Sequence, residues 1–244
     1  MTLQTTRGDN GDRIVWNDAV LDEARSSLFD PAWWRSRGAL LGEAQGRGAA
    51  YFLDGLDGSE WVLRHNRRGG ALARWNHDHF LYTGAERARP IRELRLIAHL
   101  DALELPVPEP VAARVTPRLG LYRGDVITRR IAAAHPLADR LARQALPSAA
   151  WQRLGAVLAR FHHAGVWHAD LNARNVLVDA DDAFHLIDFD KACLRTPGKW
   201  REANLARFYR SLAKFRDASL AFNFLEADWS ALRGGYVSAS AAAL

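Results

Sequence analysis

Three polar side chains around a short apolar hairpin constrain the possible fold and chemistry of this chain more than any other feature. Asp170 and Asn175 lie five residues apart, and Asp188 directly follows an apolar run over residues 184–187. The residues after Asn175 form a second apolar run, and turn-forming residues separate the two, so the pattern predicts a β-hairpin. Its ends would bring Asn175 and Asp188 to one mouth, where both can reach one metal cluster. An ordinary hairpin with solvated acids is the alternative, but it leaves the spacing unexplained.

The run HADLNARN and the later triplet Asp188-Phe189-Asp190 resemble two motifs of protein-kinase-like phosphotransferases, HxDxxxxN and DFG. The resemblance implies that Asp170 is the catalytic base and that Asn175 and Asp188 bind Mg²⁺. Phosphoryl transfer needs such groups because its transition state is mainly charge. Asp190 replaces the usual Gly, and its role stays open. We expect His168 to support this loop through hydrogen bonds.

A glycine-rich segment lies nearer the N-terminus, between apolar stretches at residues 39–41 and 49–53. Glycine lets backbone N–H groups approach phosphates closely. We therefore expect Gly42, Gly46 and Gly48 to form a hairpin over the phosphates of ATP. The alternative is a plain turn, for which three glycines are common.

The next predicted strand ends at Arg64, where a kinase fold would place its phosphate-binding Lys. No Lys occurs before Lys191, so Arg64 is the candidate for that role. Arg and Lys are not interchangeable, and this difference is the main argument against activity. Glu93, near the start of a predicted helix at residues 90–103, is expected to pair with Arg64 as the αC Glu does in kinases. A Glu favoured by the helix dipole is the alternative.

The pattern between and after these motifs predicts two parts. Residues 104–110 must be extended because of their prolines, and residues 111–116 and 120–128 are expected to be strands that lead into a hinge at 129–131. Beyond it the periodicity is helical, with apolar stripes at Trp151, Leu154, Leu158 and Phe161 and at Leu205, Phe208, Leu212 and Phe215.

These elements predict an α+β, bilobal, protein-kinase-like fold with ATP between the lobes. The N-terminal lobe would cover residues 1–136, with a small antiparallel sheet and one helix, and the mostly helical C-terminal lobe would cover residues 137–244. A short helix is expected at residues 21–28. Residues 1–12 and 238–244 are expected to be loose tails.

Composition restricts the partners. The 244 residues carry a formal charge of +5, which favours anionic partners such as phosphates, glycans or a membrane surface. Nucleic acid is not expected, since no nucleic-acid-binding motif occurs. A single Cys193 excludes an internal disulfide and fits a reducing, cytoplasmic compartment. No apolar run is long enough to span a bilayer, and the N-terminus lacks the apolar core of a signal peptide.

A narrower resemblance rests on the stretches HADLNARNVLVD, LIDFD, VLRHNRRGG and RELRLIAHLDALELPVPEPVAARV. They are similar to 3-deoxy-D-manno-octulosonic acid (Kdo) kinases, in the lipopolysaccharide kinase branch of the superfamily. This implies ATP-dependent phosphorylation of the 4-hydroxyl of a Kdo sugar on lipid A, at the cytoplasmic face of a bacterial inner membrane, with peripheral membrane contact. In that family Arg commonly stands at the position of Arg64. Arg67 and Arg68 then become candidates to bind the anionic acceptor, or they belong to a solvated loop.

Two rival functions share parts of this pattern. An aminoglycoside-type phosphotransferase would keep the chemistry but usually presents an acidic acceptor cleft, whereas this chain is basic. A pseudokinase acting as a binding module would explain the missing Lys, but not the retention of Asp170, Asn175 and Asp188. A zinc site at His162, His163, His168 and Asp170 is not expected, because adjacent His162 and His163 point to different helix faces.

Overall fold

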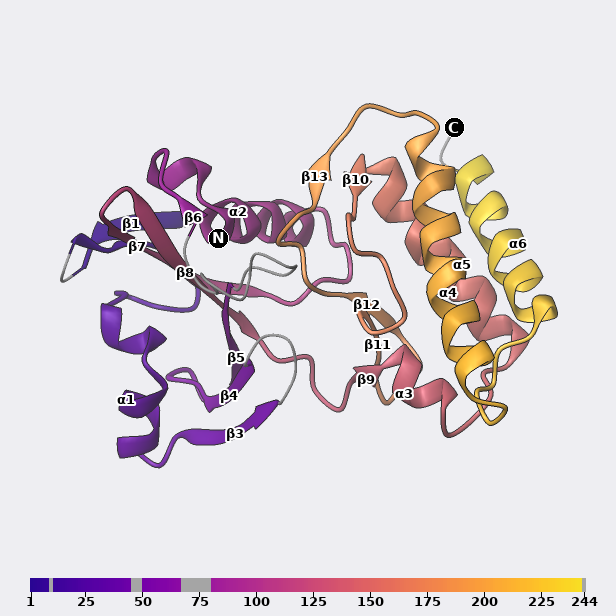
Figure 1. The fold of residues 1–244 in the computed structure, drawn as a ribbon, viewed down its shortest axis with the longest axis horizontal. Helices are drawn as coiled ribbons and strands as arrows, with labels where there is room; N and C mark the ends of the chain where they lie inside the picture. The colour runs from indigo at the N-terminus through magenta and orange to yellow at the C-terminus, as the bar shows by residue number, and fades with distance from the viewer. Residues whose placement is uncertain (9–10, 45–49, 67–79, 243–244) are drawn as a thin grey trace. The chain divides into compact units, whose positions relative to one another are not determined.

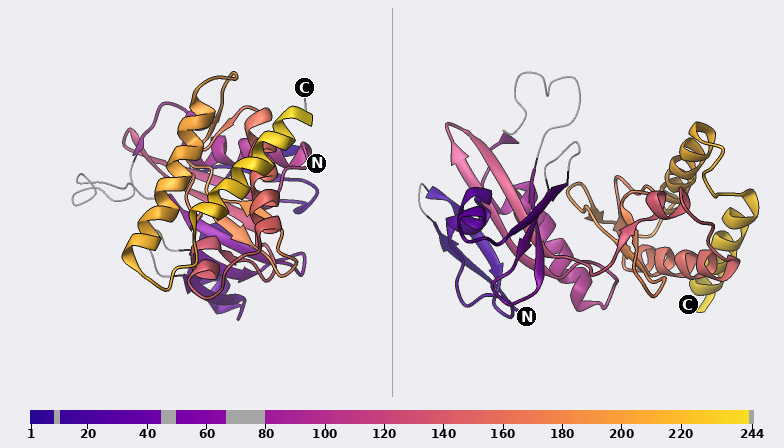
Figure 2. Two further views of the ribbon diagram at one scale, coloured as in Figure 1. Left: turned by 90° about the vertical axis from the view of Figure 1, so that its right-hand side faces the viewer. Right: turned by 90° about the horizontal axis from the view of Figure 1, so that it is seen from below.

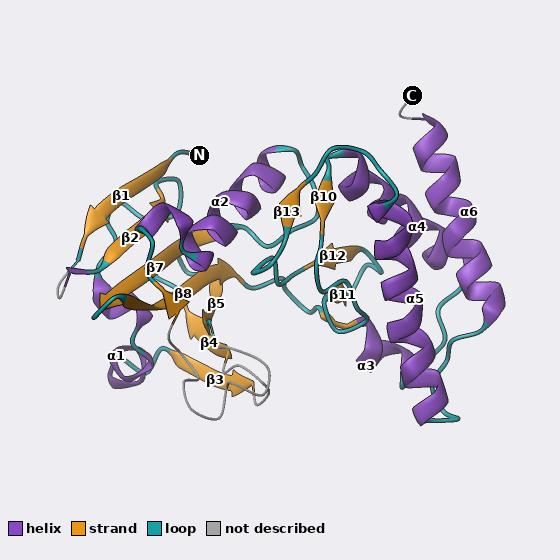
Figure 3. Ribbon diagram, turned by 45° about the horizontal axis from the view of Figure 1, so that its top comes forward, coloured by secondary structure: helices purple, strands orange, loops and turns teal. Residues whose placement is uncertain are grey.

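The computed structural model describes residues 1–8, 11–44, 50–66 and 80–242 of the chain. The chain divides into two compact units (Figure 1). The first unit contains Met1–Asp101 and Pro108–Arg130, and the second contains Ala102–Val107 and Ile131–Leu244. Figure 3 shows strands in orange and helices in purple. The architecture is therefore mixed α and β, as expected, while the assignment of lobes to residues 1–136 and 137–244 stays a prediction.

An antiparallel, eight-stranded sheet forms the first unit, in the order β1-β2-β7-β8-β5-β4-β3, with β6 paired to β8. The strands predicted at residues 111–116 and 120–128 are confirmed as β7 and β8. The strand predicted to end at Arg64 is confirmed as β5. The strands are β1 (Leu3–Arg7), β2 (Arg13–Asn17), β3 (Leu40–Ala44), β4 (Ala50–Asp54), β5 (Glu60–His65), β6 (Phe80–Leu81), β7 (Pro110–Arg118) and β8 (Leu121–Arg129).

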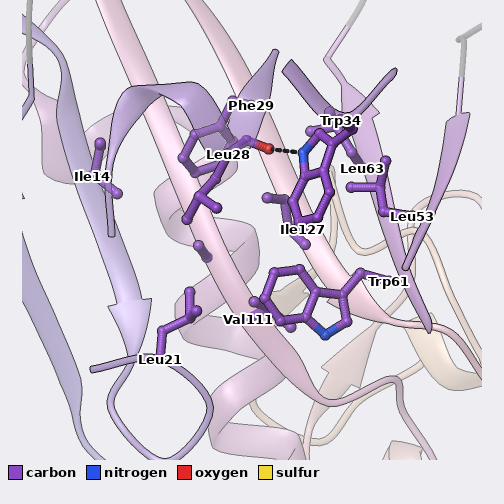
Figure 4. Packing of buried hydrophobic residues seen from close by; sticks show 11 residues of the cluster. Ile14, Leu21, Leu28, Phe29, Trp34, Leu53, Trp61, Leu63, Val111 and Ile127 are labelled. Atoms are coloured by element: carbon purple, nitrogen blue, oxygen red, sulfur yellow. Dashed lines mark hydrogen bonds between the residues drawn. The ribbon is translucent and has the colours of Figure 1, made fainter. Parts of the chain in front are cut away.

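Each face of this sheet carries a hydrophobic cluster, since neighbouring residues of a strand point to opposite faces and apolar residues occur on both. Val15 and Val126 belong to the cluster that includes Ile91 and Leu94 of α2 (Arg89–Ala102), the helix predicted at residues 90–103. On the other face, η2 (Ser26–Phe29) and α1 (Pro31–Ser36) close a second cluster, shown in Figure 4. There the indole Nε1 of Trp34 donates a 2.8 Å hydrogen bond to the carbonyl of Leu28.

The expectation of a single helix in this part was wrong, since a sheet with two apolar faces needs a cover on each. The missed signal was local: Asp30 caps α1 by accepting a hydrogen bond from the N–H of Ala32, and Pro31 occupies the first turn. The helix expected at residues 21–28 is absent, because only the short 3-10 turn η2 begins there, at Ser26. A further 3-10 turn, η4 (Ala85–Arg87), precedes α2.

Residues 1–12 were also wrongly expected to be a tail. Residues 3–7 form the edge strand β1, which pairs with β2 along its whole length. Asp18 holds the start of this strand: its carboxylate accepts a 2.7 Å hydrogen bond from the N–H of Thr2, and this bond and a second from Gln4 lower the pKa of Asp18. The strand is polar, so its sequence carries little strand signal.

Helices dominate the second unit, and the predicted hairpin is confirmed within it: β11 pairs antiparallel with β12. Strand β9 joins them in a three-stranded sheet, and β10 pairs with β13. The elements are β9 (His135–Pro136), α3 (Leu137–Leu141), α4 (Ser148–His163), β10 (Val166–Trp167), β11 (Val176–Val178), β12 (Phe184–Leu186), β13 (Cys193–Leu194), α5 (Trp200–Ala218) and α6 (Glu226–Ala242).

Helices α4 and α6 pack against each other (Figure 2). Two glycines lie at this contact. A Cβ on Gly155 would lie 2.0 Å from the carbonyl oxygen of Leu232, and one on Gly235 would lie 2.0 Å from that of Gln152. The loose tail expected at residues 238–244 was wrong for its described residues, because α6 continues to Ala242. No helix within the described ranges is long and apolar enough to cross a membrane.

Candidate functional site

Side-chain amides hold Asp170 and Asn175 together in the loop between β10 and β11. The side-chain amides of Asn172 and Asn175 each donate a 2.9 Å hydrogen bond to the backbone carbonyl of Asp170. In turn, the side-chain oxygen of Asn172 accepts from the N–H groups of Arg174 and Asn175. The loop is thus closed on itself, and the carboxylate of Asp170 is presented at an exposed position.

His168 joins this loop to the strand that leads to Asp188, as expected. Its Nε2 donates a 2.9 Å hydrogen bond to the carbonyl of Ile187, and its Nδ1 accepts one of 3.3 Å from the N–H of Asp170. These two bonds require the neutral imidazole with its proton on Nε2. Burial agrees with this form, because it lowers the pKa of His168.

Asp188 is fixed by its neighbours on both sides. The N–H of Ile187 donates a 3.0 Å hydrogen bond to the carbonyl of Asn175, so the two predicted metal-binding positions lie at one end of the hairpin. Phe189 is buried, with its ring against those of Phe161 and His168. Asp188 itself has a φ of 67°, in the left-handed region that non-glycine residues seldom adopt. Such backbone is typical of functional positions.

The donor set fits Mg²⁺. Because the side-chain N–H of Asn175 is used by Asp170, its oxygen remains as the acceptor, and Asp188 adds a carboxylate. Mg²⁺ binds proteins through one or two such oxygen ligands together with substrate phosphates. No cluster of three His, Cys, Asp or Glu side chains suited to a metal occurs in the part of the chain that the structure describes. The metal role of Asn175 and Asp188 stays a prediction.

Helix α5 contacts this loop with three polar residues that the sequence reading missed. Asn204 donates a 2.7 Å hydrogen bond to the carbonyl of His168, and the Ser211 hydroxyl accepts a 3.1 Å bond from the N–H of Ala173. Between them, the guanidinium of Arg207 forms an ion pair with the carboxylate of Asp170. Positions 204, 207 and 211 share one helix face, so their spacing was a usable signal.

In the first unit, Arg64 and Glu93 form the predicted ion pair. Alternation along β5 explains it: Leu63 belongs to the cluster beneath α1, so Arg64 points to the opposite face, on which α2 packs. The side chain of Glu93 is fully buried, whereas that of Arg64 is 32% exposed. The contact is present, and the phosphate-binding role of Arg64 stays a prediction.

The glycine-rich hairpin is described only in part. Strands β3 and β4 are antiparallel partners, and Gly42 lies opposite Phe52 beside a β-bulge. A Cβ on Gly42 would meet the Phe52 ring at 3.8 Å, an ordinary contact, so packing does not require glycine there. Gly46, Gly48, Arg67 and Arg68 lie outside the described residues.

His162 has structural partners. Its Nε2 donates to the side-chain oxygen of Asn204 at 3.2 Å, and its Nδ1 accepts from the Tyr236 hydroxyl at 2.9 Å. Burial lowers the pKa of His162 from 6.5 to about 4, against the opposing effect of Asn204. His162 is therefore neutral near pH 7 and joins α4 to α5 and α6.

Comparison with known proteins identifies the family of this chain. The chain belongs to the lipopolysaccharide kinase (Kdo/WaaP) family, whose model matches residues 31–236. It is 42% identical over 225 residues to a 3-deoxy-D-manno-octulosonic acid kinase of Stenotrophomonas maltophilia, covering 91% of this chain and 88% of the relative. A protein of the same name from Xanthomonas campestris pv. campestris is 45% identical over 205 residues, covering 83% and 81%. One from Actinobacillus succinogenes is 37% identical over 227 residues, covering 91% and 93%.

Proposed function

We propose that the chain is an ATP-dependent kinase that phosphorylates the 4-hydroxyl of a Kdo sugar on lipid A during lipopolysaccharide biosynthesis. One observation carries the chemistry: a single hydrogen-bonded loop presents the carboxylate of Asp170 beside Asn175, next to the backbone that holds Asp188. The relatives named as Kdo kinases support the choice of acceptor.

In this proposal Asp170 accepts, or orients, the proton of the acceptor hydroxyl while the oxygen attacks the terminal phosphorus of ATP. A positioned proton acceptor contributes typically ~10²–10⁴ in rate. The exposed carboxylate is reachable by a large acceptor. His168, Asn172 and Asn175 hold the loop so that this carboxylate does not have to be ordered during the reaction.

Phosphate charge is neutralised by two groups of residues. Mg²⁺, held by Asn175 and Asp188, would supply charge stabilisation to the phosphate oxygens. Arg64, kept in place by Glu93, would hold ATP phosphates in place of the usual Lys. We also propose that the two compact units are the two lobes of a protein-kinase-like fold, with the sheet, Arg64 and α2 in one and the catalytic loop in the other.

The acceptor is lipid-linked, so we propose peripheral contact with the anionic cytoplasmic face of the inner membrane. The β7–β8 turn supports this. Leu119 at its tip is 94% exposed and has a φ of 48°, so its placement is unfavourable both for solvation and for the backbone. Arg118 and Arg123 are exposed on the same hairpin. Leucine flanked by arginines suits a surface of anionic lipids.

A vesicle experiment tests the membrane contact. The chain should co-float with vesicles that contain anionic lipid, and Leu119→Asp should reduce the bound fraction several-fold. Leu220→Asp is the matched control, since Leu220 is also fully exposed but lies in the second unit. Equal loss of binding in both variants would contradict a role for the β7–β8 turn.

Transfer of labelled phosphate from ATP to Kdo-lipid A tests the proposed function directly. The reaction should require Mg²⁺ and should stop in excess chelator. An aminoglycoside, supplied in parallel, should not be labelled. Labelling of the aminoglycoside alone, or nucleotide binding with no transfer to any acceptor, would contradict the proposal.

A further inference from the structure

The ion pair between Arg207 and Asp170 has no evident structural purpose. The side chains are 46% and 50% exposed. Exposed ion pairs typically contribute only about 0–1 kcal/mol to stability. Helix α5 is already attached to the loop without it, because Asn204 binds the carbonyl of His168 one turn earlier and Ser211 binds the N–H of Ala173 one turn later.

These two attachments determine where Arg207 lies. Asn204 is buried and also contacts Nε2 of His162, so the start of this helix face is held firmly. Arg207 therefore presents a guanidinium at hydrogen-bond distance from the carboxylate that, under the proposed function, receives the acceptor hydroxyl. An acceptor hydroxyl that reaches Asp170 therefore lies close to Arg207.

A guanidinium has five N–H donors in a planar fork that matches a carboxylate. Only one ion-pair partner of Arg207 is found among the described residues, Asp170. The named acceptor of the relatives is a sugar acid, which carries a carboxylate on the same small molecule as its hydroxyl groups. The charge, shape and place of Arg207 therefore fit this group.

We propose that Arg207 is the carboxylate-binding residue of the acceptor site. It holds the carboxylate of the sugar acid while the hydroxyl of the same sugar lies at Asp170, so that one ring is oriented at two points. This inference rests on the proposed function and adds a residue on α5 to the acceptor candidates. It makes the carboxylate, rather than the lipid or its phosphates, the group that Arg207 recognises.

The experiment compares two acceptors, Kdo-lipid A and its carboxylate methyl ester, in the wild-type chain and in Arg207→Gln. The wild type should prefer the free acid by about 10- to 100-fold in kcat/KM, the range expected for one charge-assisted contact. Arg207→Gln should lose most of this preference through a higher KM for the acid, with the KM for ATP unchanged. Arg207→Lys should recover part of it, since Lys is a point charge.

Arg210→Gln is the matched control, because Arg210 lies on the same helix and is exposed. It should keep the preference of the wild type. A variant Arg207→Gln that loses rate equally on the acid and the ester would show that Arg207 only positions Asp170, and this would overturn the inference. Retention of the full acid preference would overturn it as well.

A binding measurement separates this inference from the proposed function. Free Kdo and its methyl ester are titrated against each variant, with no ATP present. If the wild type transfers no phosphate but binds the acid better than the ester, and Arg207→Gln does not, the proposed reaction fails while the carboxylate site stands. If transfer occurs but Arg207→Gln binds the acid as the wild type does, the carboxylate site fails.

Discussion

Two arginine–carboxylate pairs, one in each unit, use the same chemistry in opposite surroundings. In the first unit, Glu93 is fully buried beneath Arg64, between the sheet and α2. In the second, Asp170 and Arg207 are each about half exposed. Removing one partner of a buried pair leaves the other charge in a medium that solvates it poorly. Removing one partner of an exposed pair leaves the other in contact with water. The first pair should therefore affect stability and function together, and the second should affect function alone.

The largest effect should come from the exposed pair. Asp170→Asn should lower kcat by ~10²–10⁴, because a neutral amide cannot accept the hydroxyl proton. The melting temperature should stay close to that of the wild type. Asp181→Asn, an exposed acid on the β11–β12 turn, is the control and should change neither quantity. Near-normal turnover of Asp170→Asn would remove Asp170 from the mechanism.

The buried pair of Arg64 and Glu93 is tested in two ways, by removing one charge and by replacing both residues with apolar ones. Arg64→Ala should lower the free energy of unfolding by about 3–5 kcal/mol, as measured by urea denaturation, and should weaken the use of ATP sharply. The double variant Arg64→Met, Glu93→Leu removes both charges, and it should recover most of the stability but none of the ATP use. Arg207→Ala should leave stability unchanged. If the double variant also regains ATP use, Arg64 does not bind phosphate.

A buried histidine extends the comparison to pH. The pKa of His162 is about 4 in the folded chain and 6.5 in the unfolded chain, so between these values the unfolded chain binds more protons. Its contribution to stability is complete above pH 6.5 and falls by about 3 kcal/mol as the pH decreases to 4.

His162→Gln should flatten this part of the stability curve, because the amide does not titrate. Unfolding free energies at several pH values between 4 and 7 measure it. Burial also lowers the pKa of His168, so some slope should remain in the variant. An unchanged slope in His162→Gln would mean that His162 does not titrate in this range.

The smallest effect is expected at Gly42, where one substitution distinguishes a packing role from close approach of the backbone to the phosphates of ATP. Gly42→Ala meets only an ordinary contact at Phe52, so stability should hold or rise by up to about 1 kcal/mol. The KM for ATP should nevertheless rise several-fold if the backbone of β3 approaches phosphates. An unchanged KM would mean that Gly42 belongs to a plain strand.

The sequence was most informative where the signal was local. The hairpin around Asn175 and Asp188 follows from one apolar alternation and one turn, and α2 follows from Pro90 and a regular apolar stripe. The pair formed by Arg64 and Glu93 could be predicted because a known arrangement of strand and helix placed them together.

Contacts between distant segments could not be predicted in the same way. Strand β1 is polar and gains its conformation by pairing with β2, which in turn depends on β7. Arg207 lies 37 residues from Asp170, and nothing in either local pattern relates them. Apart from the spacing of Asn204, Arg207 and Ser211, only the fold reveals that this face of α5 belongs to the site.

The left-handed backbone of Asp188 has a consequence for the evolution of the chain. For most residues this conformation costs roughly 1–2 kcal/mol, whereas glycine does not bear this cost and asparagine and aspartate bear less of it. Selection for folding stability alone would therefore favour glycine at this position, which would remove the carboxylate. If Asp188 binds the metal, only continued selection for turnover preserves it. A lineage without selection for turnover should replace Asp188 early, so the residue at this position in related proteins should distinguish active copies from inactive ones.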